Sequence, residues 1–258
     1  MEVKSPLRQK PLPNPGDSVD AKIQELIDDR MLTWLLASLL AVFLAFMEWL
    51  RVYLPREPSP WLFSSFAVIV IATSVFRIRK FREKLKFLRQ GRDGEIAVGQ
   101  FLERCREQGA KLFHDIPGDG FNLDHVIIHT SGIYVIETKT ISKPISGRAE
   151  LIFNGSTIRC EGKFTTDKPL IQVQAARHWL SSLLGESTGR RILKSSIRPV
   201  VVYPGWYITP TAEAKLSDVW VLNPKALPEF ISNSRTQLTV DEVHMYALHL
   251  SKYIRTTK

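Results

Sequence analysis

The chain has 258 residues, 44% of them hydrophobic, and carries 35 lysines and arginines against 26 aspartates and glutamates, a net charge of +9. This length allows one full domain plus a smaller element, and the positive charge favours a polyanionic partner, either nucleic acid or an anionic membrane surface. Two cysteines, Cys105 and Cys160, exclude a disulfide framework, fit a reducing compartment and lack the spacing of zinc ligands.

The N-terminal segment, residues 1–30, is expected to lack a core of its own. Its first 20 residues contain five prolines or glycines and no hydrophobic periodicity. This composition predicts a disordered tail. A short polar helix is expected to follow, from about Ser18 to Arg30.

Two apolar runs come next, at about 31–50 and 60–76, and a short segment rich in proline and charge separates them. Each apolar core is somewhat shorter than the ~20 residues of a membrane-spanning helix. Aromatic residues at their ends, of the kind found at membrane interfaces, extend them: Trp34, Trp49, Tyr53 and Trp61. The pattern predicts a transmembrane hairpin over 31–76. A buried helical pair in a soluble domain is one alternative. A cleaved signal peptide is another, although the apolar run begins late, after an acidic stretch.

A basic helix is predicted at 77–90, directly after the second apolar run. Seven lysines and arginines fall within residues 77–89. The positive-inside rule places this side in the cytoplasm, and two crossings return the N-terminus to the same side. We therefore expect a multi-pass protein of the cell inner membrane with both termini in the cytoplasm. One face of this helix is apolar: Ile78, Phe81, Leu85 and Leu88. It is expected to lie on anionic headgroups, and a basic entry to a nucleic-acid groove is the alternative.

A further helix is predicted to open at Gly91-Arg92-Asp93-Gly94-Glu95 and to run to about Gln108. Glu95 lies at the edge of its apolar stripe. That stripe consists of Val98, Phe101, Leu102 and Cys105. Cys105 is therefore interpreted as a residue of the core.

A β-hairpin is predicted over residues 122–139, with Ser131-Gly132 as its two-residue loop. This register places Asp124 opposite Lys139 and diagonal to Glu137. Side chains alternate along a strand, and cross-strand partners share a face, so these three side chains are expected to converge at the open end of the hairpin. A change of one residue in the loop would move Asp124 to the opposite face.

The converging side chains are those that metal-dependent phosphodiester hydrolysis uses. Mg²⁺ (or Mn²⁺) takes oxygen ligands and keeps several waters, so Asp124 and Glu137 are the expected metal ligands. Lys139 can position a water or offset charge on the phosphate. The alternative is a surface salt bridge on a sheet edge. His125 is expected to point away from Asp124 and to serve packing or the surface rather than catalysis.

The second half of the chain predicts further strands and helices around the hairpin. Asn154-Gly155 predicts a turn between strands at 148–153 and 156–160. Asp167 is expected to cap a helix with Pro169 in its first turn and Gln172 close behind. The buried side of that helix is expected to be Val173, Ala176, Leu180 and Leu183.

The C-terminal part is expected to complete the sheet and to add two helices. Ser196–Tyr203 is predicted as a strand buried near the centre of the sheet, and Val219–Leu222 as a shorter one. Asn223-Pro224 is expected to start a helix that ends near Ser232. Thr239 is expected to begin the last helix, with Val243, Tyr246, Leu250 and Tyr253 facing inward.

The order of these motifs resembles the nuclease-related domain (NERD) family, a branch of the PD-(D/E)xK restriction-endonuclease-like superfamily. The matching segments are Gly94-Glu95, Asn122-Leu123-Asp124-His125, the run from Gly132 to Lys139, and Lys168-Pro169-Leu170-Ile171-Gln172. The hairpin motif is specific, whereas the Gly-Glu and Pro-x-x-Gln pieces are weak alone. The resemblance covers roughly residues 90–205, under half of the chain. The family pattern has Asn-Pro where this chain has Lys168-Pro169, a minor departure.

The resemblance implies an α/β fold for residues 91–258. This is a restriction-endonuclease-like mixed sheet flanked by helices, and the transmembrane helical hairpin precedes it. The resemblance also implies that Glu95 and Gln172 complete the site formed by Asp124, Glu137 and Lys139.

The expected function is that of a membrane-anchored, Mg²⁺-dependent nuclease that hydrolyses phosphodiester bonds of DNA or RNA at the cytoplasmic face. Its partners would be nucleic acid and the lipid bilayer. One alternative is a catalytically inactive nucleic-acid-binding module with the same fold. Another is a membrane scaffold whose soluble domain binds protein.

Overall fold

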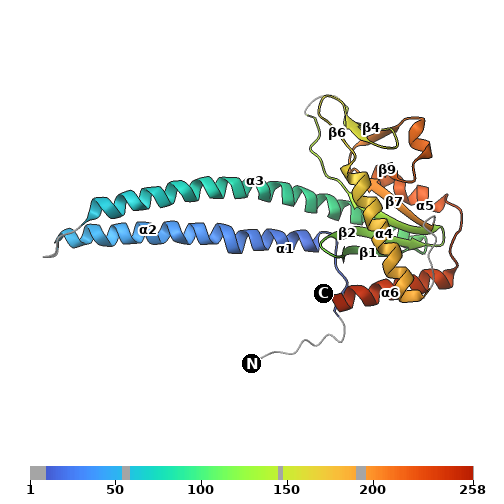
Figure 1. The fold of residues 1–258 in the computed structure, drawn as a ribbon, viewed down its shortest axis with the longest axis horizontal. Helices are drawn as coiled ribbons and strands as arrows, with labels where there is room; N and C mark the ends of the chain where they lie inside the picture. The colour runs from blue at the N-terminus through green and yellow to red at the C-terminus, as the bar shows by residue number, and fades with distance from the viewer. Residues whose placement is uncertain (1–9, 54–58, 145–147, 190–195, 258) are drawn as a thin grey trace. The chain divides into compact units, whose positions relative to one another are not determined.

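The structure, a computed structural model, describes residues 10–53, 59–144, 148–189 and 196–257. Figure 1 shows the helices and strands. The chain divides into two compact units. One is Ser18–Gln90, and the other combines Gly91–Lys258 with the residues up to Asp17.

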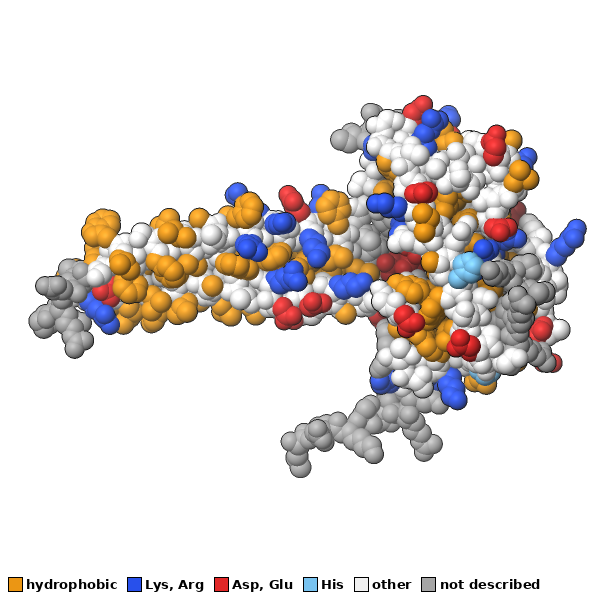
Figure 2. Space-filling model, viewed as in Figure 1, with side chains coloured by type: hydrophobic (Ala, Val, Ile, Leu, Met, Phe, Trp, Pro, Cys, Tyr) orange, Lys and Arg blue, Asp and Glu red, His pale blue; other side chains and the backbone are white. Residues whose placement is uncertain are grey.

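The helical unit contains consecutive helices that begin with α1 (Asp17–Glu25), a π-helix η1 (Leu26–Met31) and α2 (Leu32–Leu50). A 3₁₀ turn η2 (Arg51–Tyr53) follows, and α3 (Pro60–Glu107) then runs back alongside (Figure 1). By length and composition alone, both helical stretches are long and apolar enough to cross a membrane. Figure 2 shows hydrophobic side chains along their surface.

Aromatic contacts hold the two helical stretches together. The rings of Trp49 and Trp61 meet edge to face with centroids 5.7 Å apart. The Trp49 Nε1–H donates to Ser64 Oγ at 3.0 Å, and the Arg77 guanidinium lies 5.4 Å from the ring centre of Trp34. Residues predicted as interfacial aromatics therefore also form the contacts of a helical hairpin.

Helix α3 corrects the prediction of separate helices after the second apolar run. It is continuous for 48 residues and takes in the second apolar run, the basic segment and the segment predicted to open at Gly91. A glycine inside a helix costs about 1 kcal/mol relative to alanine, which is too little to end a helix with this much packing. The predicted end near Gln108 is close to the observed end at Glu107.

The apolar face of the basic segment is covered, contrary to the prediction that it lies on headgroups. Leu85, Phe81 and Leu88 pack against α1 and η1 in a cluster with Val19, Ile23, Leu26, Ile27 and Met31. The π-helix explains how this stripe continues, because the wider turn keeps residues five apart, such as Leu26 and Met31, on one side.

The second unit has a five-stranded mixed sheet in the order β1-β2-β3-β7-β9. Its strands are β1 (Lys111–Pro117), β2 (Asn122–His129), β3 (Gly132–Thr138), β7 (Ile197–Val202) and β9 (Trp220–Leu222). The first three are antiparallel, and β7 and β9 run parallel to β3. The predicted mixed sheet is therefore confirmed, including an internal position for β7.

A second, four-stranded sheet has the order β6-β5-β4-β8. Its strands are β4 (Glu150–Phe153), β5 (Ile158–Cys160), β6 (Phe164–Thr166) and β8 (Tyr207–Pro210). Asn154 Oδ1 accepts from the amide of Thr157 at 2.7 Å, so the predicted Asn-Gly turn exists but extends over four residues.

Helices cover both faces of the five-stranded sheet (Figure 1). On one face α4 (Lys168–Thr188) and α6 (Val240–Thr257) pack against strand residues such as Val135 and Val201. On the other face the C-terminal part of α3 and α5 (Leu227–Ser232) pack against Ile136 and Val200. The short 3₁₀ turns η4 (Glu213–Leu216) and η5 (Pro224–Ala226) flank β9.

The described part of the predicted N-terminal tail is packed rather than disordered. Leu12 lies against the core of the second unit. Pro15 touches α3 so closely that a Cβ at Gly99 would lie 2.5 Å from its Cγ. Apolar and proline contacts thus fix residues 10–16, which local composition alone did not predict. Residues 1–9 lie outside the described residues.

Candidate active site

The hairpin that carries Asp124 has a different loop from the predicted one. His129 pairs with Gly132, so the two-residue loop is Thr130-Ser131. The residue numbers of each observed pair add up to 261, whereas those of the predicted pair Asp124–Lys139 add up to 263. The observed pairs end at His125–Ile136, and extending the same register by one residue would put Asp124 across from Glu137. The predicted position opposite Lys139 was wrong. The predicted face is kept because side chains alternate with period two.

Glycine is required at the first position of β3. Gly132 has a backbone φ of 138°, and a Cβ there would lie 3.1 Å from the carbonyl oxygen of Ser196, the residue directly before the neighbouring strand β7. Glycine adopts this conformation readily, whereas other residues do so only with strain. Gly132 therefore begins the strand instead of lying in the loop.

The two hairpin strands separate where the carboxylates lie. Pairing of β2 with β3 reaches His125–Ile136, while β3 stays paired with β7 as far as Thr138. The Thr138 amide donates to Asp124 Oδ2 at 2.6 Å. A side-chain carboxylate thus takes the place of a strand partner, which fixes the Asp124 side chain at the open end of the hairpin.

Glu137 and Lys139 form a close ion pair beside Asp124. The distance from Lys139 Nζ to Glu137 Oε1 is 2.6 Å. Their side chains are 15% and 30% exposed respectively, so the pair is partly shielded from water. Period-two alternation explains why the two residues share a face.

Electrostatic coupling joins Glu95 to this group. Burial raises the pKa of Asp124 well above its ordinary value, and the nearby carboxylates of Glu137 and Glu95 raise it further. The amide hydrogen bond from Thr138 and the charge of Lys139 oppose this shift. Three acidic side chains therefore share one electrostatic environment.

A glycine allows α3 to approach the end of β3. A Cβ at Gly94 would lie 1.7 Å from Thr140 Oγ1, so no larger residue fits there without movement. This contact explains the Gly-Glu motif. Gly94 lets α3 pass close to Thr140, and the next residue, Glu95, is then near enough for its charge to act on Asp124.

Gln172 is not joined to the carboxylates by any contact among the described residues. It is exposed near the start of α4, with Pro169 in the first turn as predicted, and it has no hydrogen bond to Asp124, Glu137 or Lys139. Its role in the site stays a prediction.

Tyr203 is a neighbour of the site that the sequence analysis did not identify. It is 2% exposed and directly follows β7. Burial and the charge of Glu137 raise its pKa. The parallel register pairs Glu137 with Val201, so Tyr203 lies level with Lys139 on the same face. Only the β3–β7 pairing brings it there, and no motif around residue 203 signals it.

The donor set suits a hard divalent cation held by two carboxylates. Among the described residues, no three histidine, cysteine, aspartate or glutamate side chains converge closely enough to hold a metal ion. Asp124 and Glu137 nevertheless repel each other, and a bound cation would relieve that repulsion. Mg²⁺ needs only one or two protein carboxylates because it retains several waters.

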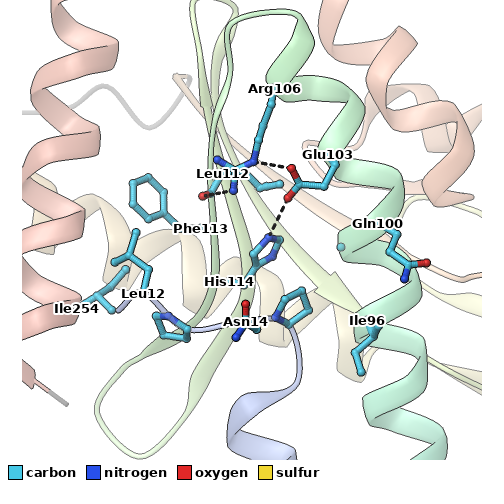
Figure 3. Close-up of a pocket in the computed structure, with 13 residues that line it drawn as sticks. Leu12, Asn14, Ile96, Gln100, Glu103, Arg106, Leu112, Phe113, His114 and Ile254 are labelled. Carbon is cyan, nitrogen blue, oxygen red and sulfur yellow. Dashed lines mark hydrogen bonds and ion pairs between the residues drawn. The ribbon is translucent and has the colours of Figure 1, made fainter. Parts of the chain in front are cut away.

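A cavity of about 350 Å³ lies at the edge strand β1, away from the carboxylates. Figure 3 shows Arg106 and His114 both directed at Glu103 on its wall. His125 lies behind His114, fully buried, with their Nδ1 atoms 2.7 Å apart. The prediction that His125 points away from Asp124 and serves packing is confirmed.

The buried histidine pair predicts a loss of stability in mild acid. Burial lowers the pKa of His114 to about 4 and lowers that of His125 as well. Protonation therefore favours the unfolded chain, where the pKa is about 6.5, so stability present above pH 6.5 falls as the pH drops towards 4. His114 alone accounts for about 3 kcal/mol across this window.

The measurement is the melting temperature of the purified full-length protein from pH 7.5 to 4.5. The double variant His114→Gln/His125→Gln should lose much of the acid dependence. The variant of an exposed histidine, His244→Gln, should keep it. Equal pH dependence in all three proteins would rule out the pair as its source.

Comparison with known proteins identifies part of the second unit. Residues 90–204 match the family model described as nuclease-related domain. No curated protein sequence matches the chain. Among solved structures, SfsA of Pyrococcus furiosus in complex with Ca²⁺ is similar, with 16% sequence identity and a TM-score of 0.25. The match covers 51% of this chain and 54% of SfsA, and so low a TM-score supports no argument about function.

Proposed function

Because residues 90–204 are a nuclease-related domain, we propose that this protein hydrolyses phosphodiester bonds of nucleic acid. The observation that carries the proposal is the partly buried group at the open end of the β2–β3 hairpin. There the charge of Glu137 acts on Asp124, and Lys139 pairs with Glu137 at 2.6 Å. Two acidic ligands and one cation are the side chains that metal-assisted hydrolysis requires.

Each residue has a distinct role in this proposal. Asp124 and Glu137 hold Mg²⁺ or Mn²⁺, which when bound polarises the phosphate and makes a bound water more acidic. Lys139 neutralises Glu137 and offers its ammonium group to negative charge that develops on the phosphate. Glu95 adds negative charge next to Asp124, and Gln172 offers an amide to substrate or water.

The direct test is cleavage of DNA and RNA, single- and double-stranded, by the purified full-length protein with Mg²⁺ or with EDTA. Metal-dependent cleavage supports the proposal. Binding of nucleic acid in EDTA without any cleavage in Mg²⁺ would favour an inactive binding module. Absence of both would favour a scaffold whose partner is a protein.

The helical unit supports a membrane anchor as the second part of the proposal. Helices α2 and α3 have the length and composition to span a bilayer, and most of their large hydrophobic side chains are exposed. The lysines and arginines after Phe76 favour a cytoplasmic location for that end by the positive-inside rule. The protein would then lie in the cell inner membrane as a hairpin with both termini cytoplasmic.

The proposed topology, a hairpin with both termini in the cytoplasm, can be tested by labelling single cysteines from either side of the membrane. In a chain without its native cysteines, Ser59→Cys should react with a membrane-impermeant thiol reagent from the non-cytoplasmic side, because Ser59 lies between α2 and α3. Thr256→Cys near the C-terminus should react only after the membrane is opened. Release of the full-length protein by alkaline carbonate would contradict a membrane-spanning hairpin.

A further inference from the structure

The helical unit contains a pocket of about 120 Å³ between its N-terminal helices and α3. Leu26 and Leu88 form an apolar floor, since both belong to the cluster that holds these helices together. The polar lining is mainly cationic: Lys22, Arg30 and Lys84, with Glu25 as the one carboxylate.

The three cations are available to a ligand. Lys22, Arg30 and Lys84 are exposed, and within the described residues none of them forms a salt bridge. Lys22, Leu26 and Arg30 are four residues apart in turn and so line one side of their helix, while Lys84 comes from α3 across the pocket. Figure 2 shows lysine and arginine side chains gathered on one part of the helical unit.

The pocket lies on the headgroup side of both apolar stretches. Leu26 lies five residues before Met31, where the first apolar stretch begins. Lys84 lies eight residues after Phe76, where the second stretch ends, which corresponds to about 12 Å along an α-helix. The headgroup layer adds roughly 5–7 Å on each side of a ~30 Å hydrocarbon core. Arg30, directly before Met31, is the lining residue nearest this layer, and the long side chain of Lys84 can extend towards it.

We propose that Lys22, Arg30 and Lys84 form a binding site for the phosphate headgroup of an anionic lipid in the cytoplasmic leaflet. The inference rests on the membrane anchor proposed above and adds a defined site to it. Basic pockets beside transmembrane helices suit such headgroups because each cation near the surface attracts an anionic lipid. The bound lipid would hold α1 and η1 against α3 at the membrane surface.

Two triple variants distinguish lipid binding in this pocket from a general attraction of anionic lipid to the positive charge of the helices. The first is Lys22→Gln/Arg30→Gln/Lys84→Gln. The control, Arg79→Gln/Arg82→Gln/Lys86→Gln, removes the same charge from exposed residues on the side of α3 opposite Lys84. Purified full-length proteins in neutral detergent are titrated with short-chain phosphatidylglycerol, phosphatidylcholine of equal chain length, or inorganic phosphate. The melting temperature reports binding.

Phosphatidylglycerol should raise the melting temperature of the wild type at far lower concentration than the other two additives. The pocket variant should bind it about 100-fold more weakly, as expected if each of the three pocket cations contributes about 1 kcal/mol through contact with the bound headgroup. The control variant should bind it nearly as well as the wild type, because its three cations make no such contact. Equal weakening in both variants, or no preference for phosphatidylglycerol, would overturn the site. An equal response to inorganic phosphate would replace the lipid with a free anion.

Flotation with vesicles distinguishes this inference from the anchor on which it rests. Wild type that floats with neutral phosphatidylcholine vesicles but shows no preference for phosphatidylglycerol contradicts the pocket alone. Wild type that floats with no vesicles contradicts both the anchor and the pocket.

Discussion

Replacing Asp124 with asparagine is expected to abolish cleavage of nucleic acid and, at the same time, to raise the melting temperature. Burial and the carboxylates of Glu137 and Glu95 disfavour the Asp124 anion and raise its pKa. Asparagine keeps the shape and can still accept the Thr138 amide hydrogen bond, but it removes the charge. The variant therefore loses a metal ligand and relieves a repulsion.

The pH dependence of this stabilisation has a definite sign. A carboxyl group whose pKa is raised on folding contributes stability at low pH, and that contribution is lost as the pH rises through the folded-state value. Asp124→Asn should therefore exceed the wild type in melting temperature at pH 7.5, and the difference should shrink towards pH 4. Mg²⁺ should raise the melting temperature of the wild type and leave that of the variant nearly unchanged.

Asp119→Asn is the matched control, because Asp119 is exposed in the loop before β2 and lies outside the carboxylate group. It should resemble the wild type in activity and in its response to Mg²⁺. An Asp124→Asn protein that melts below the wild type at neutral pH would contradict the repulsion between the carboxylates.

Lys139→Ala should lower turnover by about 10²-fold while leaving metal affinity largely intact. Removal of one group that stabilises transition-state charge costs roughly this much, and a charged lysine cannot be a metal ligand. Freed from its 2.6 Å ion pair with Lys139, the Glu137 carboxylate can still bind the metal. The magnesium concentration for half-maximal activity should therefore change far less than kcat.

The control for this prediction is Lys163→Ala, in the exposed turn between β5 and β6. It removes the same charge at a distance from the carboxylates in sequence and should leave kcat unchanged. Equal loss of kcat in both variants would mean that Lys139 acts only through the net charge of the domain.

The sequence predicted the face of each hairpin residue better than it predicted their pairing. Period-two alternation placed Asp124, Glu137 and Lys139 together, and that grouping survives the change of loop because the register shifted by two residues. The position of the loop depends on Gly132, which closely approaches Ser196, the residue before β7. A local turn rule contains no information about that segment.

Long-range packing also explains the other differences. The four-stranded sheet was not fully anticipated, since its strands are short and β4 pairs with β8, which is distant in sequence. Strand β1 was not predicted either. Helix α3 continues through Gly91 because contacts on both sides of that position support it. Tyr203 reaches the site only through the parallel pairing of β3 and β7.

The most direct test of the central claim is the rate of phosphodiester cleavage as a function of Mg²⁺ concentration. It should be measured for the purified full-length wild type and for Asp124→Asn/Glu137→Gln prepared side by side. The wild type should show a rate that rises and saturates with Mg²⁺ and disappears in EDTA, and the double variant should show no rate above background. Equal rates in the two proteins, at any Mg²⁺ concentration, would contradict a nuclease centred on Asp124 and Glu137.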